Sequence, residues 1–213
     1  MLRHLLLFAL SLTLLAACQD TNTNSTTDVT DTEQPAVQPA VPQQSSSAPM
    51  KGDNYEVTVL DDKIKSPRKE LSGTVGDVPL RINYGSPAVN ERTIYGDLVP
   101  FGKVWRTGAN EATRITFEKD VMVGDANKKL AAGTYALFTL PDNRNEWTVI
   151  FNKVADQWGA YDYDESADVA RIKGTAKDAG TPYERMDFTL QGDAVKLMWD
   201  DLEIMFPVAA AGK

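Results

Sequence analysis

The sequence predicts an all-β fold: a single antiparallel β-sandwich or barrel-like domain that follows a disordered N-terminal stalk. Between residues 52 and 208, short runs alternate apolar and polar residues with a period of two, which is typical of strands. No amphipathic stretch in this range predicts a helix longer than two turns. Residues 19–50 contain no aromatic, no Leu or Ile and no basic residue, so they cannot bury enough apolar surface to order themselves.

The N-terminus has the features of an export signal. Arg3 and His4 precede a short apolar run that ends in Leu15-Ala-Ala-Cys18, and this run is short for a membrane span. The string resembles the lipobox of bacterial lipoproteins, a family in which the peptide before the cysteine is removed and the thiol is lipidated. We therefore divide the chain into a signal peptide (1–17), lipidated Cys18 with a disordered linker (18–51), a β-sandwich domain (52–208) and a C-terminal tail (209–213).

Loss of the signal removes whole classes of chemistry. The only histidine is His4 and the only cysteine is Cys18. The mature domain then has no imidazole and no free thiol, which excludes Ser-His-Asp triads, Cys-His pairs and histidine- or cysteine-based zinc and copper sites. With a single cysteine, no disulfide forms within the chain, and the core alone must hold the domain together.

The charge balance argues against nucleic acid as a partner. After removal of Arg3 the chain carries 30 Asp and Glu against 21 Lys and Arg, a formal charge of −9. We expect no nucleic acid partner, and we expect acyl chains rather than charge to hold the protein on a membrane.

The strands are expected in the following order. Alternation predicts strands at 78–84, 114–117, 186–190, 195–199 and 204–206. The runs 135–140 and 147–151 are apolar on both faces, which indicates central strands, and the turn sequence PDNRNE separates them. Before the first of these, Leu130-Ala-Ala-Gly-Thr-Tyr135 resembles a variant of the tyrosine corner of Greek-key sandwiches, in which the phenol bonds back to the backbone. A plain strand start before a core tyrosine is the alternative.

The first candidate site is the long loop 92–113. Gly and Pro interrupt it, and long structured loops of compact domains are often functional. Arg106, Asn110 and Glu111 flank a Gly-Ala turn, so a guanidinium fork and a carboxylate face the same space and can recognise carboxylate or hydroxyl groups. For this loop we prefer the structural alternative, in which Arg106 and Glu111 pair with each other while Trp105 plugs the end of the sandwich, because most ion pairs are structural.

The second candidate site is the segment 158–168, in which aromatic residues alternate with carboxylates. Such a segment is typical of a sugar-binding shelf or a calcium loop. An EF-hand is excluded, because Ala167 and Lys173 stand where the loop needs Gly and Glu. An irregular calcium site stays open, with a solvated acidic loop preferred. Glu111 with Asp162 or Asp168 is the one carboxylate pair that we nominate for glycoside hydrolysis.

The motifs also carry a family resemblance. WRTGANEAT, AGTYALF, WTVIFNK, WGAYDYDESADVARI and MWDDLEIMFPV resemble the bacterial "domain of unknown function 2911" family over about residues 66–208. The resemblance implies a β-rich envelope or secreted domain and no particular activity. Gln19 after the cysteine resembles lipoproteins that are sorted to the outer membrane.

These observations favour a non-catalytic, lipid-anchored envelope protein, located in the outer membrane of a bacterium, that binds an envelope glycan or protein. Its ligand-binding candidates are Arg92, Trp105, Arg106, Asn110, Glu111, Trp158 and Tyr163. A carboxylate-dependent hydrolase and a purely structural envelope protein, in which Arg106 and Glu111 satisfy each other, are the alternatives. We expect no metal and no cofactor.

Overall fold

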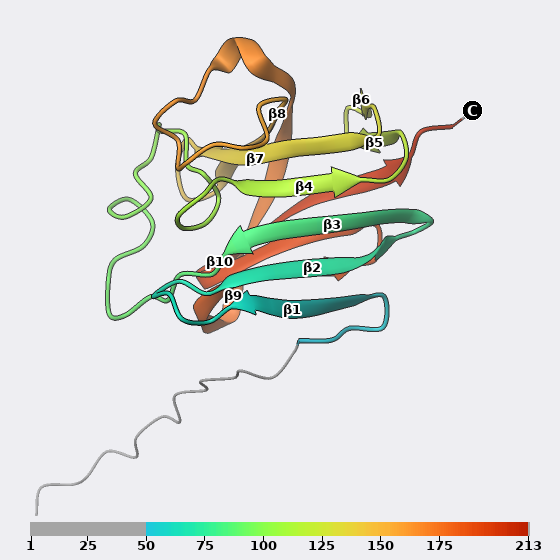
Figure 1. Cartoon of the computed structure of the whole chain (residues 1–213). Helices are drawn as coiled ribbons and strands as arrows, with labels where there is room; N and C mark the ends of the chain where they lie inside the picture. The colour runs from blue at the N-terminus through green and yellow to red at the C-terminus, as the bar shows by residue number, and fades with distance from the viewer. Residues whose placement is uncertain (1–49, 213) are drawn as a thin grey trace, which may run out of the picture. The chain divides into compact units, whose positions relative to one another are not determined.

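Ten strands form one open antiparallel sheet in the computed structural model, which describes residues 50–212 (Figure 1). Their order is β1-β2-β3-β4-β7-β8-β9-β10-β5-β6. Their bounds are β1 (Tyr55–Asp61), β2 (Arg68–Val75), β3 (Val78–Gly85), β4 (Thr113–Phe117), β5 (Val121–Val123), β6 (Lys128–Leu130), β7 (Gly133–Pro141), β8 (Glu146–Asn152), β9 (Asp168–Gln191) and β10 (Ala194–Ala210). One short 3₁₀-helix, η1 (Glu165–Ala167), is the only helix in this range. The all-β prediction is confirmed.

Alternation along the strands places one face of the sheet in the core. In β3, Val78, Leu80, Ile82 and Tyr84 are each at most 1 % exposed, while the residues between them face outward. A strand turns successive side chains to opposite faces, so this pattern needs no other cause. The strand predicted at 78–84 is confirmed, and β4 extends the one predicted at 114–117 by one residue.

The central strands β7 and β8 are buried on both faces, as their sequences predict. Their outward residues Phe138 and Ile150 form a second, smaller core that is covered by Ala160 and Tyr163 from the loop that follows β8. The loop 153–167 is thus packed onto the sheet by its own apolar side chains.

The last two strands make a long hairpin that crosses over the rest of the sheet. The first part of β9 pairs with β8, and its remainder pairs with β10. In Figure 1 this hairpin runs behind β2 and β3, and the Tyr84 and Phe188 rings meet edge to face at 4.9 Å. The main core is enclosed between the hairpin and the first strands. The separate strands expected at 195–199 and 204–206 are one strand, β10, which bends at register shifts around Asp200.

A buried ionic group joins the hairpin to the first strands. Lys69 Nζ lies 2.7 Å from Asp187 Oδ1, and the Tyr84 hydroxyl donates a hydrogen bond to the same oxygen at 2.9 Å. The side chains of Lys69 and Asp187 are only 11 % and 13 % exposed. Removal of one of these two buried charges would destabilise the fold, because the other charge would remain desolvated without a partner.

The predicted tyrosine corner variant is present. The Tyr135 hydroxyl donates a hydrogen bond to the carbonyl of Ala131 at 2.8 Å. The bond ties the start of β7 to the chain that enters it.

The folded part extends slightly past the expected limits. The amide of Val57 donates to the carbonyl of Met50 at 2.7 Å, and β10 continues to Ala210, where it pairs with Val121 of β5. The predicted signal peptide, Cys18 and almost all of the predicted linker lie outside the described residues. Residues 50–212 contain no helix long and apolar enough to cross a membrane.

We predict that Asp187→Asn lowers the free energy of unfolding by about 3–5 kcal/mol, because it leaves the Lys69 ammonium buried without a counter-charge. Urea unfolding followed by tryptophan fluorescence measures the change. The triple variant Lys69→Met, Tyr84→Phe and Asp187→Leu should recover most of the loss, because neither a buried charge nor an unpaired buried hydroxyl remains.

The matched control is Asp77→Asn, which removes the exposed ion pair between Asp77 and Lys119 and should leave the unfolding midpoint near that of the wild type. Equal midpoints for Asp187→Asn and Asp77→Asn would show that the buried pair does not hold the layers together.

Candidate functional site

The two loops that the sequence singles out lie against each other. Ala112 donates its amide to the carbonyl of Gln157 at 3.0 Å, and Gly159 donates to the carbonyl of Asn110 at 3.1 Å. Glu111 and Trp158 form an antiparallel bridge between these bonds. Residues 110–112 and 157–159 therefore pair like two very short strands and form one surface.

A close backbone crossing with β3 and two residues with positive φ values shape the first loop. A Cβ on Gly85 would lie 2.2 Å from the carbonyl oxygen of Ala109, so only glycine fits at this crossing. Thr107 and Asn110 have positive φ values of 54° and 64°, and the Thr113 hydroxyl holds the loop by donating to the carbonyl of Thr107 at 2.7 Å. The loop is thereby fixed by backbone contacts and presents Glu111 outward.

A hollow of about 390 Å³ opens beside Trp158. Two ion pairs line it: Arg68 Nη1 lies 2.6 Å from Glu111 Oε1, and Arg114 pairs with Asp156. The Trp158 side chain is 60 % exposed, so one flat apolar surface stands at the edge of a charged, hydrogen-bonding hollow.

A second hollow of about 400 Å³ adjoins the first and shares Arg114, Ala155 and Asp156 with it. Strand register builds its floor in two rows across the outer face of the sheet. One row is Glu70, Asn83 and Arg114, and the other is Arg81, Thr116 and Thr134. We call the two hollows together the outer groove.

The outer groove contains acceptor atoms without partners. Asn83 Oδ1 and Gln157 Oε1 are both enclosed and have no hydrogen-bond partner within residues 50–212. Buried polar atoms are normally paired, so these two enclosed acceptors are exceptions within the described residues.

Of the seven predicted binding residues only Glu111 and Trp158 line the outer groove; Arg92, Trp105, Arg106, Asn110 and Tyr163 do not. Trp105 is 8 % exposed and stacks on Trp199 at 5.7 Å, so it belongs to the core. Arg92 donates from Nε and Nη2 to the carbonyls of Val89 and Ala88, and so ties its own turn together. Neither side chain lines the outer groove.

The expected pairing of Arg106 with Glu111 is wrong. Glu111 pairs with Arg68 on β2, a strand that lies next to the loop only in the folded chain. Arg106 Nε is enclosed without a hydrogen-bond partner, and burial lowers the pKa of this guanidinium. The mutual satisfaction that a purely structural motif requires is therefore missing.

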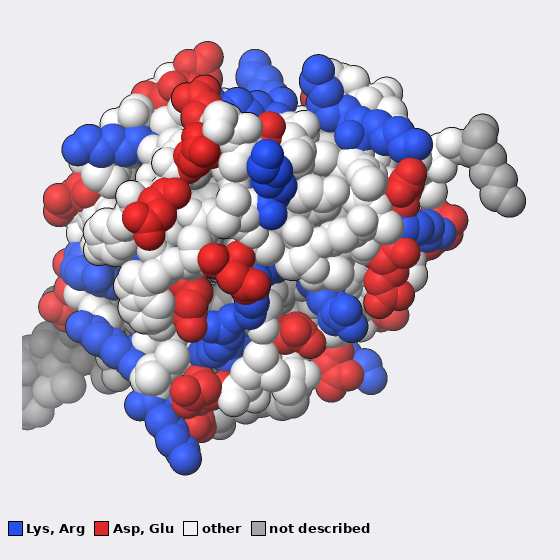
Figure 2. Space-filling model, turned by 45° about the horizontal axis from the view of Figure 1, so that its top comes forward, with Lys and Arg blue, Asp and Glu red and all other residues white. Residues whose placement is uncertain are grey.

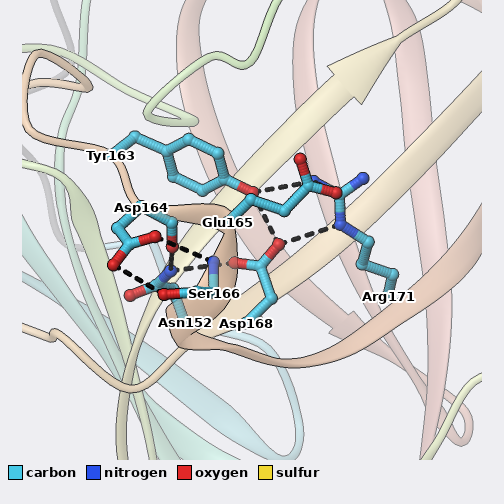
Figure 3. A network of polar contacts seen from close by, with 7 residues as sticks. All are labelled: Asn152, Tyr163, Asp164, Glu165, Ser166, Asp168 and Arg171. Carbon is cyan, nitrogen blue, oxygen red and sulfur yellow. Dashed lines mark hydrogen bonds and ion pairs between the residues drawn. The ribbon is translucent and has the colours of Figure 1, made fainter.

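Tyr163 and Asp168 belong to a closed polar network (Figure 3). Asp168 accepts hydrogen bonds from the Tyr163 hydroxyl at 2.6 Å, from Arg171 Nε at 2.8 Å and from Asn152 Nδ2 at 2.8 Å. The Tyr163 ring packs on Phe138 at 4.9 Å. The Asp168 side chain is 7 % exposed, so its oxygens serve the protein itself.

The other acidic residues of this loop also have local roles. Asp164 caps η1 by accepting from the amide and hydroxyl of Ser166 (Figure 3), while Asp162 is exposed. Within residues 50–212 no three carboxylates are arranged to hold a metal ion. Nothing in this geometry favours the hydrolase hypothesis, because Asp168 is engaged and Glu111 is neutralised by Arg68.

Most residues of the outer groove were not nominated from the sequence. Arg68, Asn83, Arg114, Asp156 and Gln157 lie on strands or in a turn between the two motifs. The polar face of the alternating runs 78–84 and 114–117 was the signal that could have found Asn83 and Arg114.

Charges of both signs alternate over the surface. In the view of Figure 2, Lys and Arg lie among Asp and Glu, with uncharged surface between them. This face carries no broad positive field of the kind that binds nucleic acid.

Comparison with known families matches residues 66–208 to one family, described as "Protein of unknown function (DUF2911)". No curated protein and no solved structure matches the chain.

We predict that Tyr163→Phe removes a pH-dependent contribution to stability. Burial, followed by the hydrogen bond to Asp168, raises the pKa of Tyr163 from 10.0 to about 12. The folded state then holds the proton more tightly than the unfolded state, so the contribution is complete below pH 10 and is lost between pH 10 and 12. The difference in unfolding free energy between wild type and variant should shrink over that range in urea titrations. A difference that stays constant would contradict the shift.

Proposed function

The chain belongs to the DUF2911 family, and we propose that its β-domain is a non-catalytic module of the bacterial cell envelope that binds a glycan in the outer groove. A lipid on Cys18 holds it to the membrane. The observation that carries the proposal is the exposed Trp158 beside a hollow lined by Arg68, Glu111 and Arg114.

Trp158 supplies the apolar half of such a site. A sugar ring has a face of C–H groups that packs on an indole, and an indole that is 60 % exposed in a folded domain is available for that contact. The guanidinium groups beside it donate hydrogen bonds to the hydroxyls around the sugar ring, and the carboxylate groups accept hydrogen bonds from them.

The charged side chains that line the outer groove favour a ligand with many hydroxyl groups over a single small ion. Its lining contains three arginines, Arg68, Arg81 and Arg114, and three carboxylates, Glu70, Glu111 and Asp156. Within each of the ion pairs Arg68–Glu111 and Arg114–Asp156, the opposite charges compensate each other. The lone pairs and N–H groups that the pairs do not use remain available for hydrogen bonds to a ligand. A ligand with many hydroxyls can use both kinds of group without displacing an ion pair.

The volumes of the two hollows and the closed network around Asp168 support ligand binding rather than catalysis. Hollows of about 390 and 400 Å³ lie within the usual range of ligand sites. The carboxylate nominated as a second catalytic group, Asp168, is enclosed by Tyr163, Arg171 and Asn152.

The membrane anchor rests on the sequence. Cys18 follows Leu-Ala-Ala, and the 32 residues 19–50 have the composition typical of a tether between a lipid anchor and a folded domain. Gln19 favours the outer membrane as the destination.

We predict that Trp158→Ala weakens glycan binding about tenfold, because the stacking surface is lost. Isothermal titration of residues 50–212 with the envelope oligosaccharides that bind the wild type measures the change, after a thermal-shift screen has selected them.

The matched control is Phe101→Ala, which truncates another exposed aromatic side chain, one that does not line the outer groove. Equal losses in both variants, or no oligosaccharide bound by the wild type, would contradict the proposal.

We predict that Cys18→Ala moves the full-length protein from the membrane fraction to the soluble fraction, because the acyl chains are its anchor. Metabolic labelling with palmitate should mark the wild type and not the variant. Wild-type protein that takes up no label would overturn the anchor while leaving the outer groove untouched.

A further inference from the structure

Arg106 is exceptional among the eight arginines of residues 50–212. Six of the other seven bond to carboxylates or to carbonyls of their own turn, and Arg185 reaches the carbonyl of Ser86 at 3.3 Å. In this part of the chain Arg106 has no ion pair and no side-chain hydrogen bond, and its Nε is enclosed without a partner.

Arg106 lines neither hollow of the outer groove, but it lies beside the turn that carries Trp158. A Cβ on Gly159 would lie 4.0 Å from Arg106 Cδ, so the stem of the arginine passes beside the turn that carries Trp158. Tyr161, which is 83 % exposed, lies on the same side of this glycine, with two ring atoms 3.0 Å from that Cβ position. Gly159 has a φ of 68°, which lets the turn bend sharply between the two aromatic residues.

No carboxylate of the domain compensates this positive charge. Burial lowers the pKa of the Arg106 guanidinium, and the only ionisable neighbour that acts on this pKa is the Tyr161 phenol, which raises it. A half-buried cation without a counter-ion is costly, and unpaired polar groups of this kind mark functional positions. The arginines of the outer groove are different, since Arg68 and Arg114 already hold carboxylates.

We propose that Arg106 recognises an anionic substituent, a carboxylate or a phosphate, on the ligand of the outer groove, so that the protein binds acidic glycans in preference to neutral ones. The inference rests on the proposed function, in which Trp158 supports a sugar ring. The ring packs on Trp158, and its acidic group reaches past Gly159 to the guanidinium. The planar fork of an arginine matches the paired oxygens of such a group.

The experiment compares each acidic sugar with an uncharged partner of nearly the same shape. Oligogalacturonate and a hyaluronan tetrasaccharide are paired with their methyl esters, and a sugar phosphate is paired with the free sugar. Titration of residues 50–212 should show each preferred acid binding about tenfold or more tightly than its partner, since a charge-assisted hydrogen bond is lost on neutralisation. Whether the carboxylates or the phosphate show this preference identifies the anionic group.

Arg106→Gln should bring the ratio of acid to neutral affinity close to one while binding of the neutral sugar persists. Lys128→Gln, which removes one exposed positive charge on β6, should keep the wild-type ratio. Because Arg106 has no partner to lose, Arg106→Gln should also unfold at or above the wild-type temperature.

Three results would overturn the inference. Equal binding of acid and neutral partner by the wild type would refute the anion site and leave the glycan groove standing. A sharp fall in the unfolding temperature of Arg106→Gln would make Arg106 a structural residue. Failure of every sugar to bind the wild type would refute the glycan groove and the anion site together.

Discussion

The structure depends on one buried contact, the ion pair of Lys69 and Asp187 with the Tyr84 hydroxyl. It joins β2 and β3 to β9 across 118 residues of sequence. An apolar interface tolerates a small slip between layers, whereas two desolvated charges are satisfied in one arrangement only. The contact therefore selects the position in which the β9–β10 hairpin covers the first strands. It matters more here because the domain contains no disulfide.

The same contact determines what faces the solvent. Successive residues of a strand point to opposite faces, so an inward Lys69 places Arg68 and Glu70 outward, and an inward Tyr84 places Asn83 outward. These outward residues line the outer groove. The internal ion pair and the proposed binding surface are thus two sides of the same strand register, and a slip by one residue would exchange them.

The charged residues of the domain fall into two groups that behave differently. The network of Asp168, Tyr163 and Arg171 is closed, because every group satisfies another and an apolar ring packs beneath it. The outer groove is open, because Trp158 is exposed and charged side chains line two hollows beside it. The first arrangement is suited to holding a loop in place and the second to receiving a ligand. This contrast separates a structural role from a binding role more clearly than residue type does.

The sequence by itself determined the features that depend on near neighbours: the strands with period-two alternation, the two-sided burial of β7 and β8, and the bond from Tyr135 back to Ala131. The tertiary structure alone decided which side chains meet. Glu111 pairs with Arg68 rather than with nearby Arg106, and Trp105 is buried while Trp158 is exposed. Alternation is a local property of the backbone, whereas an ion pair or an exposed ring depends on which distant strand lies beside it. That neighbour is set by long-range packing, which no local pattern contains.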